Sequence, residues 1–154
     1  ICEYIGNILK QQNHEIKIEP ISLELKKLSE YDAIILGASI RYGKHQKSVF
    51  NFINKYKDLL ETKKSAFFSV NVVARKSEKN SPNTNPYMKK FLKTSSWQPN
   101  KLGVFAGKVD YPSYKFFDKY IIKMIMWITK GPTDTSQSYE FTDWNVVENF
   151  AKTL

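Results

Sequence analysis

The hydrophobic residues of this chain form short continuous runs that alternate with stretches of helical spacing. Residues 33–40 begin with the run AIIL, and residues 65–73 read SAFFSVNVV. Neither run shows the polar alternation of a strand with one wet face, so both are predicted to be strands buried on both sides. A further strand is expected over residues 101–111. Residues 14–21, HEIKIEPI, alternate apolar and charged positions as an edge strand does.

Helical spacing fills the intervals between these strands. Apolar residues recur every three or four positions from Ile1, after His45, after Asn85 and at the C-terminal end. Asn85 precedes a proline, which suits the first helical position, and asparagine can accept hydrogen bonds from the free amides there. Thr142 is expected to cap the last helix in the same way. The alternation of strands and helices predicts one α/β domain over residues 1–154, with a three-layer parallel sheet.

The first residues constrain the count of strands. The chain opens within a helical pattern at Ile1, and its first methionine is Met88. One strand before Ile1 would complete a five-stranded doubly wound sheet, so we expect the domain to be incomplete at its N-terminus. Without that strand, the strands at 14–21 and 33–40 are each expected to leave a row of backbone groups unpaired.

Composition limits the kinds of site and partner that this chain can have. One cysteine and two histidines among 154 residues cannot form any familiar metal cluster, so no metal ligand is assigned. The net charge of +9 favours an anionic partner, such as a phospholipid surface, a nucleic acid or a carboxylated small molecule. No apolar stretch approaches the roughly 20 residues that a membrane-spanning helix needs.

Candidate chemistry lies after the first buried strand. Gly37 and Gly43 bracket a small polar and aromatic turn that contains Arg41 and Tyr42. Loops that leave the carboxyl ends of parallel strands build the ligand crevice of open α/β sheets. The turn is therefore a candidate binding loop, although an ordinary βα turn would look similar.

Four segments together resemble a known family. They are GASIRYGKH, SVNVVARKSEK, YPSYKFFDKYIIKMIM and TDTSQSYEFTDW, in this order. The chain resembles the flavodoxin-like, quinone-dependent protoporphyrinogen IX dehydrogenases of bacterial haem biosynthesis over nearly its whole length. The resemblance implies a flavodoxin-like sandwich with strand order 2-1-3-4-5, whose first strand and phosphate-binding loop would precede Ile1.

The same resemblance implies an activity. Such proteins bind FMN, oxidise protoporphyrinogen IX to protoporphyrin IX, and pass the electrons to menaquinone or ubiquinone. The expected location is the cytoplasmic face of the bacterial inner membrane, as a peripheral protein.

By resemblance, two loops flank the isoalloxazine ring of FMN. Short polar side chains would bond its edge, and Ile40 or Tyr42 would cover its face. Arg41 and Arg75 would stabilise charge on reduced flavin or attract substrate propionates, or they are solvated loop charges. No catalytic residue is assigned. The expected cofactor-binding residues are Ala38, Ser39, Ile40, Arg41, Tyr42, Gly43, Ser69, Val70, Asn71, Ala74 and Arg75.

Residues 111–135 form an insert that no ordinary βα connection explains. Read as a helix, residues 115–130 carry a wide apolar surface with lysines at near-four-residue spacing. This helix would lie in a membrane interface. Alternatively, it packs on the sheet or covers the substrate pocket.

Two other functions fit parts of the sequence. A flavodoxin-type electron carrier would share the fold, but such carriers are similar to one another in being acidic. A basic membrane- or nucleic-acid-binding module without a cofactor would use residues 75–101, which hold seven basic residues and one acid. No nucleic-acid motif accompanies them, so nucleic acid is not expected as a partner and a solvated basic face is favoured.

Overall fold

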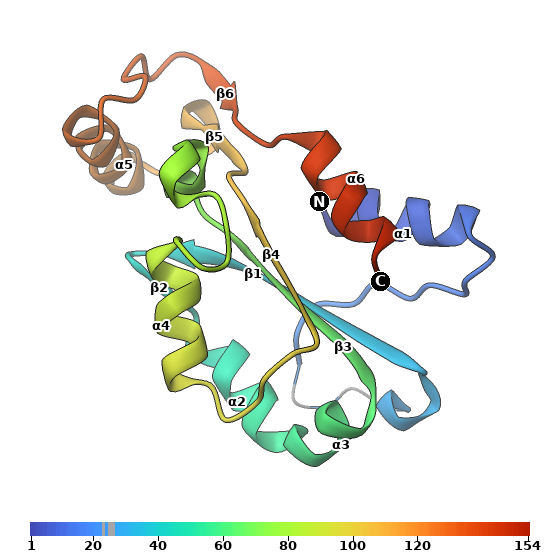
Figure 1. Cartoon of the computed structure of the whole chain (residues 1–154). Helices are drawn as coiled ribbons and strands as arrows, with labels where there is room; N and C mark the ends of the chain where they lie inside the picture. The colour runs from blue at the N-terminus through green and yellow to red at the C-terminus, as the bar shows by residue number, and fades with distance from the viewer. Residues whose placement is uncertain (23, 25–26) are drawn as a thin grey trace.

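The centre of the protein is a sheet with strand order β2-β1-β3-β4 (Figure 1). The computed structural model describes residues 1–22, 24 and 27–154. Strands β1, β3 and β4 run parallel, and β2 turns back against the end of β1 as a hairpin. The strands are β1 (Ala33–Arg41), β2 (Lys44–His45), β3 (Lys64–Val70) and β4 (Lys101–Phe105).

Helices cover both faces of this sheet, which confirms the predicted three-layer α/β fold. Figure 1 shows a layer of helices on each side of the sheet. The first layer holds α2 (Lys47–Lys55), α3 (Lys57–Thr62) and α4 (Pro86–Thr94). The second layer holds α1 (Cys2–Gln11) and α6 (Trp144–Lys152).

Strand β3 shows why its sequence lacks polar alternation. Phe67 is fully buried on the α4 side, where its ring stacks on Phe91 with 3.8 Å between centroids. Phe68 points to the opposite side and packs against Phe105 and Phe150. Since both faces of the strand meet a helical layer, both need apolar side chains.

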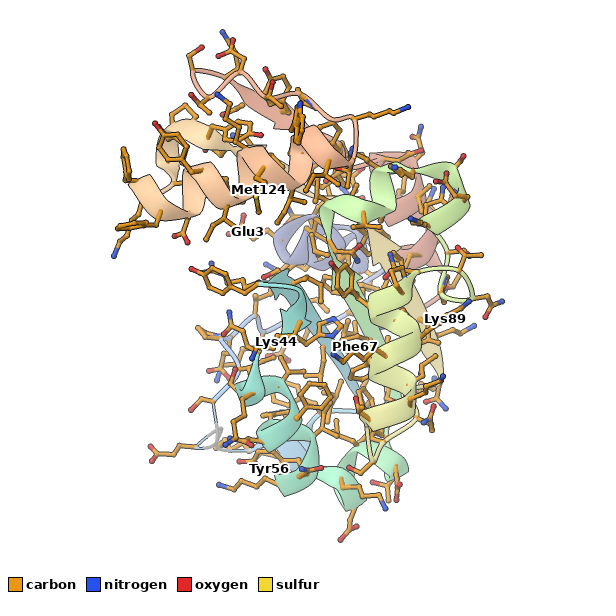
Figure 2. All side chains as sticks on the ribbon, turned by 90° about the vertical axis from the view of Figure 1, so that its left-hand side faces the viewer. Glu3, Lys44, Tyr56, Phe67, Lys89 and Met124 are labelled. Carbon is orange, nitrogen blue, oxygen red and sulfur yellow. The ribbon has the colours of Figure 1, made fainter. Side chains whose placement is uncertain are left out.

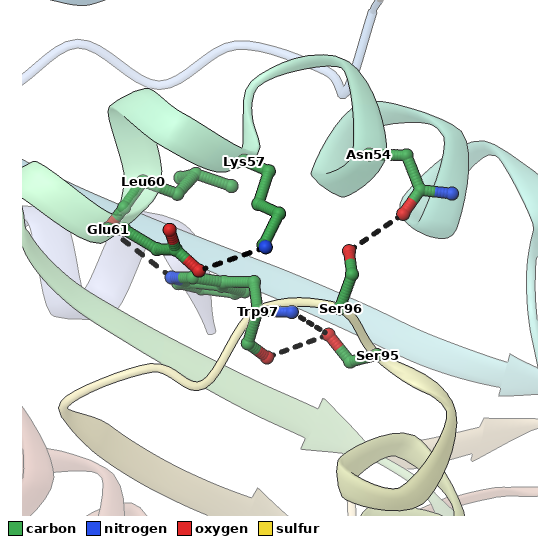
Figure 3. A network of polar contacts seen from close by, with 7 residues as sticks. All are labelled: Asn54, Lys57, Leu60, Glu61, Ser95, Ser96 and Trp97. Carbon is green, nitrogen blue, oxygen red and sulfur yellow. Dashed lines mark hydrogen bonds and ion pairs between the residues drawn. The ribbon is translucent and has the colours of Figure 1, made fainter.

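Trp97 anchors the connection that returns from α4 to β4 (Figure 3). Its indole is fully buried, and Nε1 donates to the carbonyl oxygen of Leu60, 3.3 Å away. Ser95 bonds both the backbone nitrogen and the carbonyl oxygen of Trp97, and Ser96 donates to the side chain of Asn54. The connection is thereby fixed against α2 and α3, and β4 starts in register with β3.

One predicted strand is wrong. Residues 14–21 form no strand, because no strand among the described residues pairs with them. Within the described part of the chain, the outer edge of β1 pairs only at Ile40 and Arg41, with β2. An apolar trough of about 490 Å³ runs beside the rest of this edge, and Ile16 and Ile18 line its far wall. The open edge expected for the 33–40 strand is present, and the strand before Ile1 stays a prediction.

The region after β4 also differs from expectation. The predicted strand over residues 101–111 is two strands, because the chain turns at Gly107, which has a φ of +76°. After the turn, β5 (Lys108–Asp110) pairs with β6 (Ser138–Glu140) in a separate antiparallel ribbon. Between them lie a 3₁₀ turn, η4 (Tyr111–Ser113), and α5 (Phe116–Ile128). The insert is thus a helix carried on its own two-stranded base.

Of the two predicted helix caps, one is confirmed and the other is wrong. Asn85 caps α4 as predicted, and its side-chain oxygen accepts from the backbone nitrogens of Tyr87 and Met88. For α6 the cap is Asp143 rather than Thr142, with Oδ1 3.0 Å from the nitrogen of Asn145. Asparagine, aspartate and threonine are all good caps, so residue type alone does not show whether Thr142 or the adjacent Asp143 caps α6. The remaining short turns are η1 (Leu28–Glu30), η2 (Val72–Arg75) and η3 (Ser77–Lys79).

Candidate functional site

A cavity of about 570 Å³, called the pocket below, lies at the carboxyl ends of β1, β3 and β4. Its floor and sides come from residues 39–43, 70–73 and 106–109, the segments that end or follow these strands, and α5 forms the opposite wall. Figures 1 and 2 show α5, labelled at Met124, on the same side of the molecule as the hairpin end marked by Lys44. This is the edge where parallel α/β sheets bind ligands, and the volume suits a small organic molecule.

The structure brings the two predicted loops together at this pocket. Seven of the predicted residues line it, and four do not. Ala38, Ser69 and Ala74 are buried below the surface of the pocket, and Arg75 points elsewhere. The seven that line it are Ser39, Ile40, Arg41, Tyr42, Gly43, Val70 and Asn71.

The first loop is a tight two-residue hairpin turn. Arg41 pairs with Lys44, and the intervening Tyr42 and Gly43 both have positive φ, at 49° and 74°. This conformation closes a hairpin without splaying its strands and favours glycine. Added bulk at Gly43 would meet nothing within 4 Å, so the backbone conformation alone calls for glycine there. The turn therefore projects Tyr42 outward at the mouth of the pocket.

Tyr42 joins this hairpin to the insert. Its hydroxyl donates to Oδ1 of Asp118 on α5 at 2.5 Å, although the ring is 71% exposed. The hydrogen bond and the negative charge of Asp118 raise the pKa of Tyr42 above its usual 10.0. The contact links two walls of the pocket across its mouth.

Asn71 in the second loop is used differently from the prediction. Its amide was expected to bond the edge of a flavin ring, but the side chain is engaged within the protein. Nδ2 donates to Ser69 Oγ at 3.2 Å, and Oδ1 accepts from Nδ2 of Asn85 at 3.0 Å. Its backbone nitrogen donates to the carbonyl oxygen of Phe105, which ties the end of β3 to the end of β4. Asn71 therefore shapes the pocket.

Arg75 fits neither of its two predicted roles. Its guanidinium donates to the carbonyl oxygens of Val72 and Thr129 and to the Thr129 hydroxyl, at 2.8–3.0 Å. The guanidinium also lies over the ring of Phe141, 5.9 Å from its centroid. Partial burial lowers the pKa of Arg75. Arg75 is a brace between the second loop and the end of α5, and it does not line the pocket.

Helix α5 has apolar residues on two sides, one of which lines the pocket while the other is exposed. Ile121, Ile122 and Ile125 line the pocket, and Met126 is fully buried against the β5–β6 base. The other apolar side chains form what we call the outer face of α5, and the most exposed are Phe117 at 80% and Trp127 at 73%. The outer face comprises Phe116, Phe117, Tyr120, Met124, Trp127 and Ile128. The insert thus lies over the pocket, as the alternative in which it covers the substrate pocket expects, and a second apolar surface remains on its outside.

Sequence reasoning missed the third loop of the pocket. Residues 106–109 line it, and of the two glycines that line the pocket Gly107 is the one where bulk would clash, since an added Cβ would lie 2.7 Å from Cγ1 of Val70. The rule that located the first two loops, that ligands gather after the carboxyl ends of parallel strands, applies equally to β4. It was masked because residues 101–111 read as one strand.

Positive charge predominates at the pocket. Arg41, Lys108 and Lys115 line it, and the acidic lining residue is Asp118, which already accepts the Tyr42 bond. Lys108 also lies 3.5 Å from Asp110, just outside. The arrangement favours an anionic ligand with an apolar body. None of the described helices is long and apolar enough to cross a membrane.

Comparison with known proteins gives consistent matches. A family model described as a flavodoxin domain matches residues 1–136. The Escherichia coli K12 protein named protoporphyrinogen IX dehydrogenase (quinone) is 39% identical over 155 residues, which covers 100% of this chain and 86% of that protein. A Leishmania major protein of the same name is 42% identical over 152 residues, or 96% of this chain and 66% of that protein. No solved structure matches significantly.

Proposed function

This chain belongs to the quinone-dependent protoporphyrinogen IX dehydrogenases, a family of oxidoreductases built on a flavodoxin domain, and we propose the following reaction for it. The chain binds FMN in the pocket, oxidises protoporphyrinogen IX to protoporphyrin IX, and passes the electrons to a quinone, menaquinone or ubiquinone. The observation that carries this proposal is the convergence of residues 39–43, 70–73 and 106–109 on one cavity.

The residues present fit a flat ring with a polar edge. The pocket holds about 570 Å³, its walls are largely aliphatic, and its lining includes the backbone of two positive-φ glycines, Gly43 and Gly107. An added Cβ at Gly107 would lie 2.7 Å from Cγ1 of Val70, so a side chain there would disturb another residue that lines the pocket. Bound FMN supplies the acceptor for a hydride equivalent. The protein then has to position the ring, exclude water and bind the substrate.

Positive charge at the pocket selects an anionic substrate. Protoporphyrinogen carries two propionates, and Arg41, Lys108 and Lys115 supply positive charge at the pocket. The same cations stabilise negative charge on reduced flavin. No general base is assigned to the protein: bound flavin would accept one hydride equivalent in each of three two-electron turnovers, and the accompanying protons would pass to solvent water.

We further propose that the outer face of α5 rests on a membrane, with the protein peripheral to the cytoplasmic face of the bacterial inner membrane. Burial of each large apolar side chain contributes roughly 1.5–3 kcal/mol. Each lysine near an anionic surface adds only about 1 kcal/mol. Apolar insertion by Phe117, Trp127 and Ile128 therefore dominates, and the net charge of +9 sets orientation. Since the opposite side of α5 lines the pocket, a lipid-soluble quinone would reach it along this helix.

The test of the reaction is anaerobic. The full-length protein, loaded with FMN, is mixed with protoporphyrinogen IX and then with a soluble quinone. The proposal expects the flavin to bleach on adding porphyrinogen and to recover with the quinone as porphyrin fluorescence appears. A flavin that binds but is not bleached would indicate an electron carrier, and a protein that binds no flavin would refute the redox function altogether.

Membrane contact has its own test. Flotation with anionic phospholipid vesicles compares the parent with Trp127→Ser/Ile128→Ser, and Ile18→Ser serves as the control because Ile18 is exposed on a different segment. Loss of flotation in the double variant alone supports the proposal. Equal flotation by all three proteins would end it.

A further inference from the structure

Four polar side chains form a continuous buried row behind the pocket. His45 and Asn71 are about 5% exposed, and Ser69 and Asn85 are fully buried. His45 Nε2 lies 3.0 Å from Ser69 Oγ, Ser69 Oγ accepts from Asn71 Nδ2, and Asn71 Oδ1 accepts from Asn85 Nδ2. Among the described residues, no buried side-chain nitrogen or oxygen lacks a partner. We call these four residues the buried polar row.

The row connects elements that are far apart in the sequence. His45 ends the hairpin that carries the first loop, and Ser69 lies in β3. Asn71 begins the second loop, and Asn85 caps α4. Each member thus belongs to an element that either forms part of the pocket or directly adjoins it.

Asn85 has its hydrogen-bonding capacity fully used. Its oxygen accepts from the nitrogens of Tyr87 and Met88, and its Nδ2 donates to Asn71 and to the carbonyl oxygen of Lys79. An amide with both donors and its acceptor engaged has one orientation only. Asn85 therefore fixes Asn71 on one side and Tyr87, which lines the pocket, on the other.

The His45 end of the row is equally enclosed. Its ring sits edge-on to Phe67 and Phe91, 5.5 and 5.7 Å between centroids. A serine hydroxyl can donate to or accept from an imidazole nitrogen, so either neutral tautomer completes the contact with Ser69. Directional bonds inside an apolar shell hold their geometry strongly, because a buried polar group without its partner is costly.

We propose that His45 and Asn85, which do not line the pocket, are positioning residues that set the second loop, residues 70–73, against the flavin ring. This inference rests on the proposed function in naming flavin as the ligand. Its physical content is narrower: the buried polar row determines where residues 70–73 stand. Disrupting it should alter flavin affinity and potential out of proportion to any loss of stability.

The test distinguishes the hydrogen bond from Asn85 to Asn71 from the role of Asn85 as the N-cap of α4. Asn85→Ser retains a good N-cap but removes the donor to Asn71. Asp143→Ser makes a similar change at the cap of α6, away from the pocket, and is the matched control. Urea unfolding, the dissociation constants of FMN and lumiflavin, and the midpoint potential of bound FMN are measured for each protein.

Asn85→Ser loses the Nδ2 hydrogen bonds to Asn71 and to the carbonyl oxygen of Lys79. We expect it to weaken binding of both flavins by about tenfold or more and to shift the potential. Asp143→Ser should leave binding and potential unchanged. At the other end of the row, His45→Gln should retain most of the affinity, because it can still bond Ser69, whereas His45→Phe should not. Reduced stability with unchanged affinity and potential in Asn85→Ser would overturn the proposal.

A second readout keeps the inference apart from the proposed function. Amide hydrogen exchange of the protein without ligand is followed at residues 70–73. The proposal expects faster exchange in Asn85→Ser and parent-like exchange in Asp143→Ser. If the parent binds no flavin, the proposed function fails, yet faster exchange would still support the positioning role. Unchanged exchange would refute that role, whatever the flavin does.

Discussion

Lowering the pH from 7 to 5 should destabilise this protein by about 2 kcal/mol through His45 alone. Burial lowers the pKa of His45 from 6.5 to about 4, because the surrounding Phe67, Phe91 and β3 offer no charge to stabilise an imidazolium. In the unfolded chain the imidazole takes up a proton near pH 6.5, but in the folded protein it does so only near pH 4. The unfolded state therefore binds more protons between these values, and stability falls as the pH falls through this window.

The magnitude follows from the two pKa values. At pH 5 the unfolded imidazole is almost wholly protonated and the folded one is about one-tenth protonated. The resulting factor of about 30 in the unfolding equilibrium corresponds to about 2 kcal/mol, whereas at pH 7 the contribution is only about 0.2 kcal/mol. Below pH 4 both states are protonated and His45 adds no further loss.

Urea unfolding followed by tryptophan fluorescence at pH 7, 6 and 5 checks this. The carboxylates of Asp110, Asp134 and Glu148 have lowered pKa values, through hydrogen bonds from Ser138, Ser136 and Lys152 respectively. The stability that they contribute is therefore lost mainly as the pH falls below their ordinary values of 3.8 to 4.5, outside the range from pH 7 to 5. His45→Gln should remove most of the slope, and His14→Gln, at an exposed site, should retain it. Equal stability of the parent at pH 7 and 5 would refute the reasoning, as would an undiminished slope in His45→Gln.

Four substitutions test other contacts. Gly107→Ala should destabilise the protein by about 1–3 kcal/mol, because φ is +76° and the new Cβ meets Val70, and it should weaken flavin binding; an unchanged urea midpoint would contradict this. Arg75→Lys keeps the charge but loses the forked contact with the end of α5, so amide exchange over residues 126–131 should quicken by roughly tenfold. Exchange at the parent rate would show that Arg75 is no brace. Asp143→Ala should cost about 1 kcal/mol in thermal unfolding as a lost cap, whereas Thr142→Ala should cost little; the reverse order would place the cap at Thr142.

Local signals carried the successful predictions. The continuous runs in β1 and β3 need only their own residues to indicate burial on both faces, and Asn85 before Pro86 specifies a helix start within two positions. Once these elements are in place, the geometry of parallel sheets brings residues 39–43 and 70–73 to one edge.

The failures at residues 14–21, Asn71 and Arg75 depended on partners elsewhere in the chain. Residues 14–21 have the alternation of a strand but no neighbouring strand to pair with. The partner of Arg75 is Thr129, 54 positions away, and the partner of Asn71 is Asn85, 14 positions away. Nothing in the letters around either residue shows that its polar groups are already used. The sequence thus located the loops of the site but not the roles of the side chains within them.

The proposed reaction requires a flavin ring in the pocket, and a crystal structure of the full-length protein with FMN would show whether the ring binds there. The isoalloxazine ring should lie between residues 39–43 and 70–73, beside Gly107, with α5 over its open side. A flavin bound outside this pocket, or a pocket without flavin at saturating FMN, would contradict it.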